Sequence, residues 1–94
     1  MTFAVVSAHS PHPEHRAAVL DSMQRYSATA RTQPGLVWTG VVDDVGGRLV
    51  GVAVWESEAA AAAARPALMA EVGDDPFETW HAQPLEGFRG EVLG

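Results

Sequence analysis

Apolar residues follow two periodicities in the first third of the chain. Residues 3–9 form a short run rich in valine, which predicts a β-strand. Two prolines within residues 10–14 interrupt this run, and Glu14 suits the first turn of a helix that follows. From there to about residue 31, apolar positions recur at steps of one, three and four, which predicts one helical face. The positions on this face are Val19, Leu20, Met23, Tyr26 and Ala30.

The middle of the chain predicts a β-hairpin. Pro34-Gly35 ends the helical region, and residues 36–42 form the next predicted strand. Residues 43–47 are predicted as the hairpin loop, because Gly46 and Gly47 supply the backbone freedom that a tight turn needs. Residues 48–55 form the third predicted strand, and both of its faces are apolar. We therefore expect helices on one side of the sheet and a second subunit's sheet on the other.

The last third of the chain predicts a second helix and a final strand. Ser57 is a good N-cap, and residues 59–64 are six alanines, the best helix formers. Pro66 is expected to break or kink this helix and to begin a second segment over residues 67–72. Residues 73–76 are expected to form a loop, residues 77–81 a turn or a short strand, and residues 85–93 the last strand. The order predicts an α+β, ferredoxin-like fold with an antiparallel sheet, as one domain over residues 1–94.

Composition narrows the partners that this domain could have. In a chain of 94 residues, 47% are hydrophobic and only 19% are charged, which is more apolar surface than a lone monomer easily hides. We therefore expect a homodimer. The net charge of −6 argues against nucleic acid and against an anionic membrane surface. The chain has no cysteine, which excludes disulfides and thiolate chemistry. It has no signal-like start and no apolar run of about 20 residues, so we expect a cytoplasmic protein.

Three landmarks give the chain a family resemblance. Pro34-Gly35 precedes the second strand, Trp55-Glu56-Ser57-Glu58-Ala59 follows the third, and Pro66 follows the alanine run. With this order of elements, residues 3–93 resemble the antibiotic biosynthesis monooxygenase (ABM) family. The resemblance implies a dimeric α+β barrel with a pocket between sheet and helices in each subunit. Some members of the family oxidise aromatic polyketide phenols to quinones without a cofactor, others degrade haem, and others have no established activity. A shared fold therefore leaves the activity to be argued from the site.

The haem-degrading branch fits this sequence poorly. The resemblance places its asparagine, its tryptophan and its haem-ligating histidine near Ser7, Ala62 and Glu71, and all three differ. A glutamate is not a usual haem ligand. The prediction is therefore an enzyme without a cofactor, in which an aromatic, quinol-like or polyketide-like molecule reacts with dioxygen.

Such an oxygenase needs an apolar pocket, a group that binds a phenolate and a base near neutral pH. Histidine suits the base by its pKa, which makes His9 and His81 the candidates, and Tyr26 is the candidate donor to the phenolate. His9 shares a strand face with Ser7. The residues expected to bind the substrate are Ser7, Met23, Trp38 and Trp55.

Simpler interpretations stand beside these roles. His9 could be a solvated residue before a loop, and the hydroxyl of Tyr26 could simply reach water from the core. Trp38 and Trp55 fit a core or a dimer interface, and Trp80-His81 fits an interface as well as a pocket lid.

A metal site and two other functions are the remaining alternatives. His9, His12 and His15 are three residues apart, but intervening prolines deny them a common helical face, so a metal site is disfavoured. The main alternative function is a non-catalytic, dimeric ligand-binding or stress-related barrel, and an isomerase or decarboxylase is a third. An open pocket with a weakly engaged histidine or tyrosine favours the oxygenase. A packed cavity with satisfied side chains favours the binding barrel.

Overall fold

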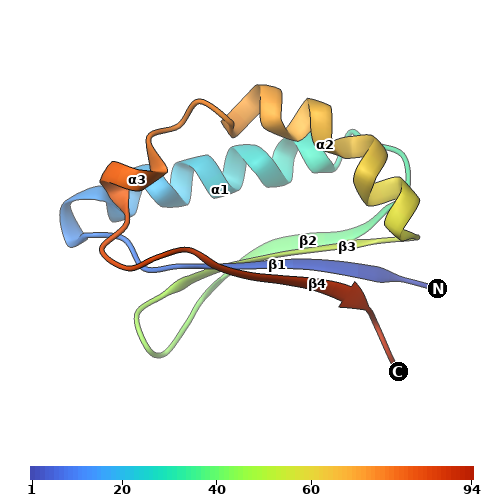
Figure 1. The fold of residues 1–94 in the computed structure, drawn as a ribbon, viewed down its shortest axis with the longest axis horizontal. Coiled ribbons are helices and arrows are strands. Elements are labelled where there is room, and N and C mark those ends of the chain that lie inside the picture. Colours follow the sequence, from blue (N-terminus) through green and yellow to red (C-terminus); the bar gives the residue numbers. More distant parts are fainter.

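A computed structural model describes residues 1–94 as a four-stranded sheet with helices over one face (Figure 1). All strand pairs are antiparallel and the strand order is β2-β3-β1-β4. This arrangement confirms the predicted α+β, ferredoxin-like fold. The elements are β1 (Phe3–His9), η1 (Pro13–His15), α1 (Arg16–Ala30), β2 (Leu36–Asp43), β3 (Leu49–Trp55), α2 (Glu58–Val72), α3 (Phe77–Trp80) and β4 (Glu86–Glu91). No helix is both long and apolar enough to cross a membrane.

Strand β1 lies in the interior of the sheet, between β3 and β4. Its residue Ser7 is opposite Gly51 of β3 and Gly87 of β4. Successive side chains of a strand point to opposite faces, so every second residue of β1 lies under the helices. Phe3 packs into the core there, and His9 is also buried. The centre of the helix-covered face is therefore built by β1 together with β3.

The core is concentrated at the Trp55 end of β3. Trp55 is 1% exposed and packs with Phe3 and with the small residues Ala61 and Ala64 of α2. Alanine lets a helix approach a sheet closely, and a buried tryptophan contributes a large contact area. A second cluster of Val19, Met23 and Leu49 lies under α1. The two clusters hold α1 and α2 above the sheet.

Helix α2 confirms its predicted start and corrects its predicted interior. The Ser57 side chain accepts a hydrogen bond from the Ala60 N–H at 3.0 Å, as expected of an N-cap. Pro66 does not start a separate segment, because the helix runs through it, although the ribbon changes direction near its middle (Figure 1). A proline leaves the carbonyl four residues earlier unpaired. Here that carbonyl belongs to Ala62, and since both residues are exposed, water can satisfy it.

The segment that the sequence described least well is a short helix. Phe77–Trp80 forms α3 rather than a turn or strand, and His81 then makes an isolated bridge with Pro11. The bridge is flanked by two backbone hydrogen bonds, from the N–H of residue 12 to the Trp80 carbonyl at 2.9 Å and from the N–H of residue 82 to the carbonyl of residue 10 at 2.8 Å. These partners are far apart in the chain, so no local pattern predicts them.

The face of the sheet away from the helices is apolar and uncovered within one chain. Val54 points to this face because its neighbours Ala53 and Trp55 are buried under the helices. Trp38 is paired with Val54 and is 51% exposed, and Phe88 of β4 is 70% exposed opposite Val6. A Cβ added at Gly40 would lie 2.9 Å from the Trp38 ring, so the indole lies flat across this glycine.

Two glycines with positive φ allow a matched test of the packing. Gly35 has φ +87° and a Cβ there would lie 2.7 Å from the Ala60 Cβ, whereas Gly47 has φ +89° with no atom within 4 Å. We expect Gly47→Ala to lower the free energy of unfolding by about 1–2 kcal/mol, the strain of the left-handed region alone. Gly35→Ala should lower the free energy of unfolding by about 1–3 kcal/mol more than Gly47→Ala does, because the new methyl group overlaps α2. Urea unfolding measures both, and equal losses would contradict the contact.

Candidate functional site

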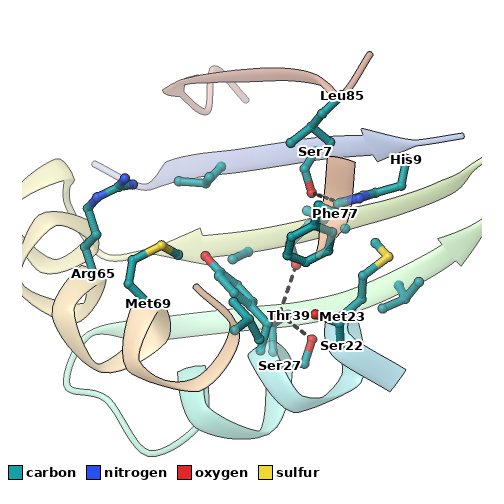
Figure 2. A pocket seen from close by; sticks show the side chains of 18 residues that line it. Ser7, His9, Ser22, Met23, Ser27, Thr39, Arg65, Met69, Phe77 and Leu85 are labelled. Atoms are coloured by element: carbon teal, nitrogen blue, oxygen red, sulfur yellow. Dashed lines mark hydrogen bonds between the residues drawn. The ribbon is translucent and has the colours of Figure 1, made fainter. Parts of the chain in front are cut away.

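A cavity of about 290 Å³ lies between the helix-covered face of the sheet and the three α-helices (Figure 2). This volume is close to the lower end of the range for small-molecule sites, about 300–1,000 Å³. Much of its wall is apolar: Val5, Met23, Val41, Ala53, Met69, Val72, Phe77 and Leu85. The polar side chains in the wall are Ser7, His9, Ser22, Tyr26, Ser27, Thr39 and Arg65.

Several of these polar side chains are engaged with one another. The Ser27 and Thr39 hydroxyls are 3.1 Å apart, and the Thr39 hydroxyl donates to a β3 carbonyl at 3.0 Å. The Ser22 hydroxyl donates to Asp75, and this bond together with Arg25 keeps the pKa of Asp75 below its usual range. Such internally satisfied groups stabilise the wall and offer little to a ligand. The other polar side chains of the wall are Ser7, His9, Tyr26 and Arg65.

One end of the cavity holds a chain of three hydrogen bonds. Ser7 Oγ is 2.9 Å from His9 Nε2, and His9 Nδ1 is 2.8 Å from His81 Nε2. His81 Nδ1 is in turn 2.7 Å from the carbonyl oxygen of Phe77. Figure 2 shows Ser7 and His9 side by side at this end, with Arg65 at the opposite end. His9 is only 6% exposed, while His81 is partly exposed behind it and does not line the cavity.

The packing around His9 makes it a neutral imidazole. Burial, together with the smaller effect of the nearby His81, lowers the pKa of His9 from 6.5 to about 4. The rings of His9 and His81 meet edge to edge through their hydrogen bond, with centroids 5.0 Å apart, and the Phe77 ring stacks on His81 at 5.6 Å. The imidazole pair is therefore held in place by aromatic contacts as well as by hydrogen bonds.

The other polar candidates are Tyr26 and Arg65. The Tyr26 hydroxyl makes no hydrogen bond within the chain, and burial raises its pKa while the charge of Arg65 partly offsets this effect. The guanidinium of Arg65 has no carboxylate within salt-bridge distance. A free hydroxyl donor and an unpaired cation therefore face an apolar cavity, which is an arrangement suited to binding an anionic oxygen.

The structure brings five of the seven predicted site residues together. Ser7, His9, Met23 and Tyr26 line the cavity, and His81 is bonded to His9. His9 is buried rather than solvated. Gly51 makes room for this group, because a Cβ there would lie 3.1 Å from both Ser7 Oγ and Met23 Cε.

The two predicted tryptophans lie elsewhere. Trp55 is in the core, and Trp38 is on the opposite face of the sheet. A β-bulge between Leu36 and Trp38 turns Leu36 inward and Trp38 outward, and simple alternation cannot reveal it. As for the histidines near the N-terminus, no group of three or more metal-ligating side chains is placed to hold an ion.

Arg65 is the main residue that the sequence interpretation missed. No pocket residue was predicted in the helix that contains the alanine run, yet Arg65 follows the run directly. Met69 and Val72 continue its face at steps of four and three, and all three residues line the cavity. This helical spacing was the available signal.

The fold and the site together define a class: a ferredoxin-like α+β domain with an apolar pocket between sheet and helices and ionisable side chains inside it. The family model "Antibiotic biosynthesis monooxygenase" (ABM) matches residues 2–83. The chain therefore belongs to the ABM family, as the landmark residues predicted. A search of curated protein sequences found no match.

Solved structures share this fold at low sequence identity. Rv0793 from Mycobacterium tuberculosis is 21% identical, with a TM-score of 0.80 over 100% of this chain and 97% of its own. A conserved protein from Methanosarcina mazei Go1 is 14% identical, with a TM-score of 0.85 over 99% and 94%. SnoaB from Streptomyces nogalater, a cofactor-independent oxygenase, is 18% identical, with a TM-score of 0.78 over 99% and 94%. At these identities the likeness concerns the fold.

The lowered pKa of His9 predicts a pH-dependent stability. Between pH 6.5 and about 4, the unfolded chain takes up a proton on this residue and the folded chain does not. The stabilisation is therefore fully present above pH 6.5 and is lost as the pH falls towards 4. His9→Gln should lack this component, so its free energy of unfolding should fall less over the same range. Urea unfolding above pH 6.5 and near pH 4 measures how much the free energy of unfolding falls. His15→Gln is the control, and its free energy of unfolding should fall as much as that of the wild type.

Proposed function

We propose that this protein is a cofactor-independent monooxygenase that oxidises an aromatic, quinol-like or polyketide-like molecule with dioxygen in the pocket. The observation that carries the proposal is the neutral, buried His9 at one end of an apolar cavity that also presents the Tyr26 hydroxyl. Membership of the ABM family supports the reaction class, as does the fold shared with SnoaB. Both substrates, the aromatic molecule and dioxygen, are part of the proposal.

The proposed chemistry begins with loss of a hydroxyl proton from the substrate. His9 is the base, and the electron-rich anion that results then reacts with dioxygen at a ring carbon. In the oxidation of an anthrone, one oxygen atom becomes the new carbonyl and the other leaves as water, so atoms balance without another reductant. Tyr26 donates to the phenolate oxygen, and Arg65, at the opposite end of the cavity from His9, binds a second oxygen of the substrate. Ser7 and Met23 contact the substrate.

One observation favours the second candidate, a non-catalytic ligand-binding barrel. Both ring nitrogens of His9 already have partners in Ser7 and His81, as expected for a satisfied structural residue. The open cavity, the free Tyr26 hydroxyl and the unpaired Arg65 favour catalysis or ligand binding over a purely structural role. The two candidates therefore differ in whether His9 exchanges its protons with a ligand.

The proposed active form is a homodimer joined through the uncovered face of the sheet. Trp38 and Phe88 stand on this face, and alternate residues of β3 add Val50, Val52 and Val54. Exposed apolar patches of this kind mark interfaces in proteins that otherwise hide such groups. A second copy that packs sheet to sheet buries Trp38 of each copy and closes the barrel that the family resemblance implies.

Oxygen uptake tests the activity. Chelator-treated protein should consume oxygen with anthrones or hydroquinones above the rate of autoxidation, and quinone should form in step. His9→Gln should lower the rate about 100-fold or more, which is the contribution of a general base. Tyr26→Phe should lower it less, since one donor to the phenolate is lost. His15→Gln, outside the pocket, is the matched control, and no uptake across the panel favours the ligand-binding barrel.

Sedimentation tests the dimer. The wild-type protein should sediment at about twice the chain mass of 10.0 kDa. Phe88→Asp places a charge in the proposed interface and should give monomers, because an unpaired buried charge is costly. Val45→Asp introduces the same charge in the fully exposed hairpin loop and should leave the dimer intact. A monomeric wild type, or a dimer that survives Phe88→Asp, contradicts this interface.

A further inference from the structure

We propose that Ser7, His9 and His81 form a directional proton relay, which accepts the hydroxyl proton of a substrate at Ser7 and delivers it to His81 at the rim of the pocket. The relay extends the proposed function, since it needs a ligand with an ionisable hydroxyl group. It assigns a contact role to Ser7, a transfer role to His9 and an exit role to His81. The chain of hydrogen bonds that forms the relay exists without the substrate and can be observed without turnover.

The direction of the relay follows from its last partner. A carbonyl oxygen can only accept, so His81 Nδ1 carries a hydrogen and donates it to Phe77. When His81 is neutral, its Nε2 is then an acceptor, so His9 Nδ1 carries a hydrogen and donates it to His81. His9 Nε2 is left as an acceptor for the hydroxyl of Ser7. One backbone carbonyl therefore determines the tautomer of both histidines and leaves the lone pairs of Ser7 Oγ available to the cavity.

Transfer needs no movement of heavy atoms. The substrate hydroxyl gives its proton to Ser7 Oγ, Ser7 gives its own proton to His9 Nε2, and His9 gives its Nδ1 proton to His81 Nε2. The products are a substrate anion, a neutral Ser7, a neutral His9 in the opposite tautomer and a His81 imidazolium. Ser7 now donates to the anion and accepts from His9. The second and third of these transfers follow hydrogen bonds that are already 2.9 and 2.8 Å long within the protein.

Burial explains why the proton leaves His9. His9 is 6% exposed and its pKa is lowered to about 4, so a charge that stays on this ring is unfavourable. His81 is partly exposed and can exchange its proton with water. A positive charge on His81 lies outside the cavity wall, and the Phe77 carbonyl accepts a hydrogen bond from the Nδ1–H of His81.

The charged groups of the surrounding elements do not compete for this proton. Asp75, which precedes α3, is held by Ser22 and Arg25 of α1, and Glu86 of β4 is paired with Arg48, the residue before β3. Arg65 of α2 lines the opposite end of the cavity from His9. His9 is therefore the titratable group that faces His81 from the sheet, and no carboxylate is paired with either ring.

The backbone holds the relay in register. Residues 10 and 12, just after β1, are hydrogen-bonded to residues 82 and 80 around His81, at 2.8 and 2.9 Å. The stacking of Phe77 on His81 fixes the ring plane. His9 and His81 thus belong to two segments joined directly to each other, which keeps the short imidazole–imidazole distance.

Tautomers measured by long-range ¹⁵N–¹H NMR test the relay without any substrate. When both imidazoles are neutral, His9 and His81 should each carry their proton on Nδ1. As His81 takes up a proton, His9 should switch to the Nε2–H tautomer while remaining neutral. A His9 that is Nε2–H at high pH, or that keeps its tautomer while His81 titrates, overturns the relay.

Two variants separate transfer from support. In His81→Gln the side-chain oxygen can still accept from His9 Nδ1 but cannot take the proton, so His9 should keep its Nδ1–H tautomer throughout the same pH range. His15→Gln is the matched control and should retain the switch. In the oxygen-uptake assay, His81→Gln should lower kcat about 10-fold or more with little change in KM, because proton removal and not binding is impaired. An unchanged kcat contradicts the exit role of His81.

The two proposals fail in different ways. If the tautomer switch is present and no phenol or anthrone is oxidised, the oxidation is wrong and the relay stands as a feature of a binding site. If oxidation occurs but the switch is absent, His9 acts alone and the relay is wrong. Ser7→Ala adds a further check, since it removes the contact atom and should lower kcat while leaving the tautomer of His81 unchanged.

Discussion

The candidate site depends on one junction, where residues 10–12 after β1 pair with residues 80–82 after α3. Without it, α3 has only its few helical hydrogen bonds and cannot hold its place, because so short a helix is unstable alone. With it, Phe77 closes one end of the cavity and His81 meets His9. The sheet supplies Ser7 and His9 of the hydrogen-bonded chain, and the junction supplies His81.

The interior of the pocket divides its polar groups by their partners. Ser27 and Thr39 satisfy each other in the wall, and Ser22 is held by Asp75, so these groups stabilise the structure. Tyr26 and Arg65 face the cavity without internal partners. An apolar site with few free polar groups orients a ligand by those groups alone. An oxygen atom of a bound aromatic ligand can therefore bind either at the imidazole end of the cavity or at the Arg65 end.

Much of the fold was predictable because local patterns determine it. The helical face containing Val19 and Met23, the cap at Ser57 and the glycines of the hairpin each report on neighbours a few residues away. The family landmarks supplied the topology. Of the site, alternation along β1 correctly placed Ser7 and His9 on one face, and the helical period placed Tyr26 near them.

The rest of the site arises from contacts that local patterns do not contain. The bulge before Trp38 changes the face of the strand by one residue, so an alternation argument puts this side chain in the pocket when it is outside. The helix at Phe77–Trp80 and the bond between His9 and His81 depend on a junction across about 70 residues of sequence. Both histidines could be proposed as bases from their chemistry, but the sequence does not predict that they touch each other.

The low pKa of His9 limits what this residue can do. A base whose conjugate acid forms only near pH 4 is a poor final holder for a phenolic proton, since phenols ionise near pH 10. If His9 were the only proton acceptor, its burial would work against the reaction that its position suggests. Its contact with His81 offers the proton a route onward, because a buried imidazole can accept on one nitrogen and release from the other without holding net charge. Burial, which makes His9 a weak base, also makes it a suitable conductor of protons between the pocket and the surface.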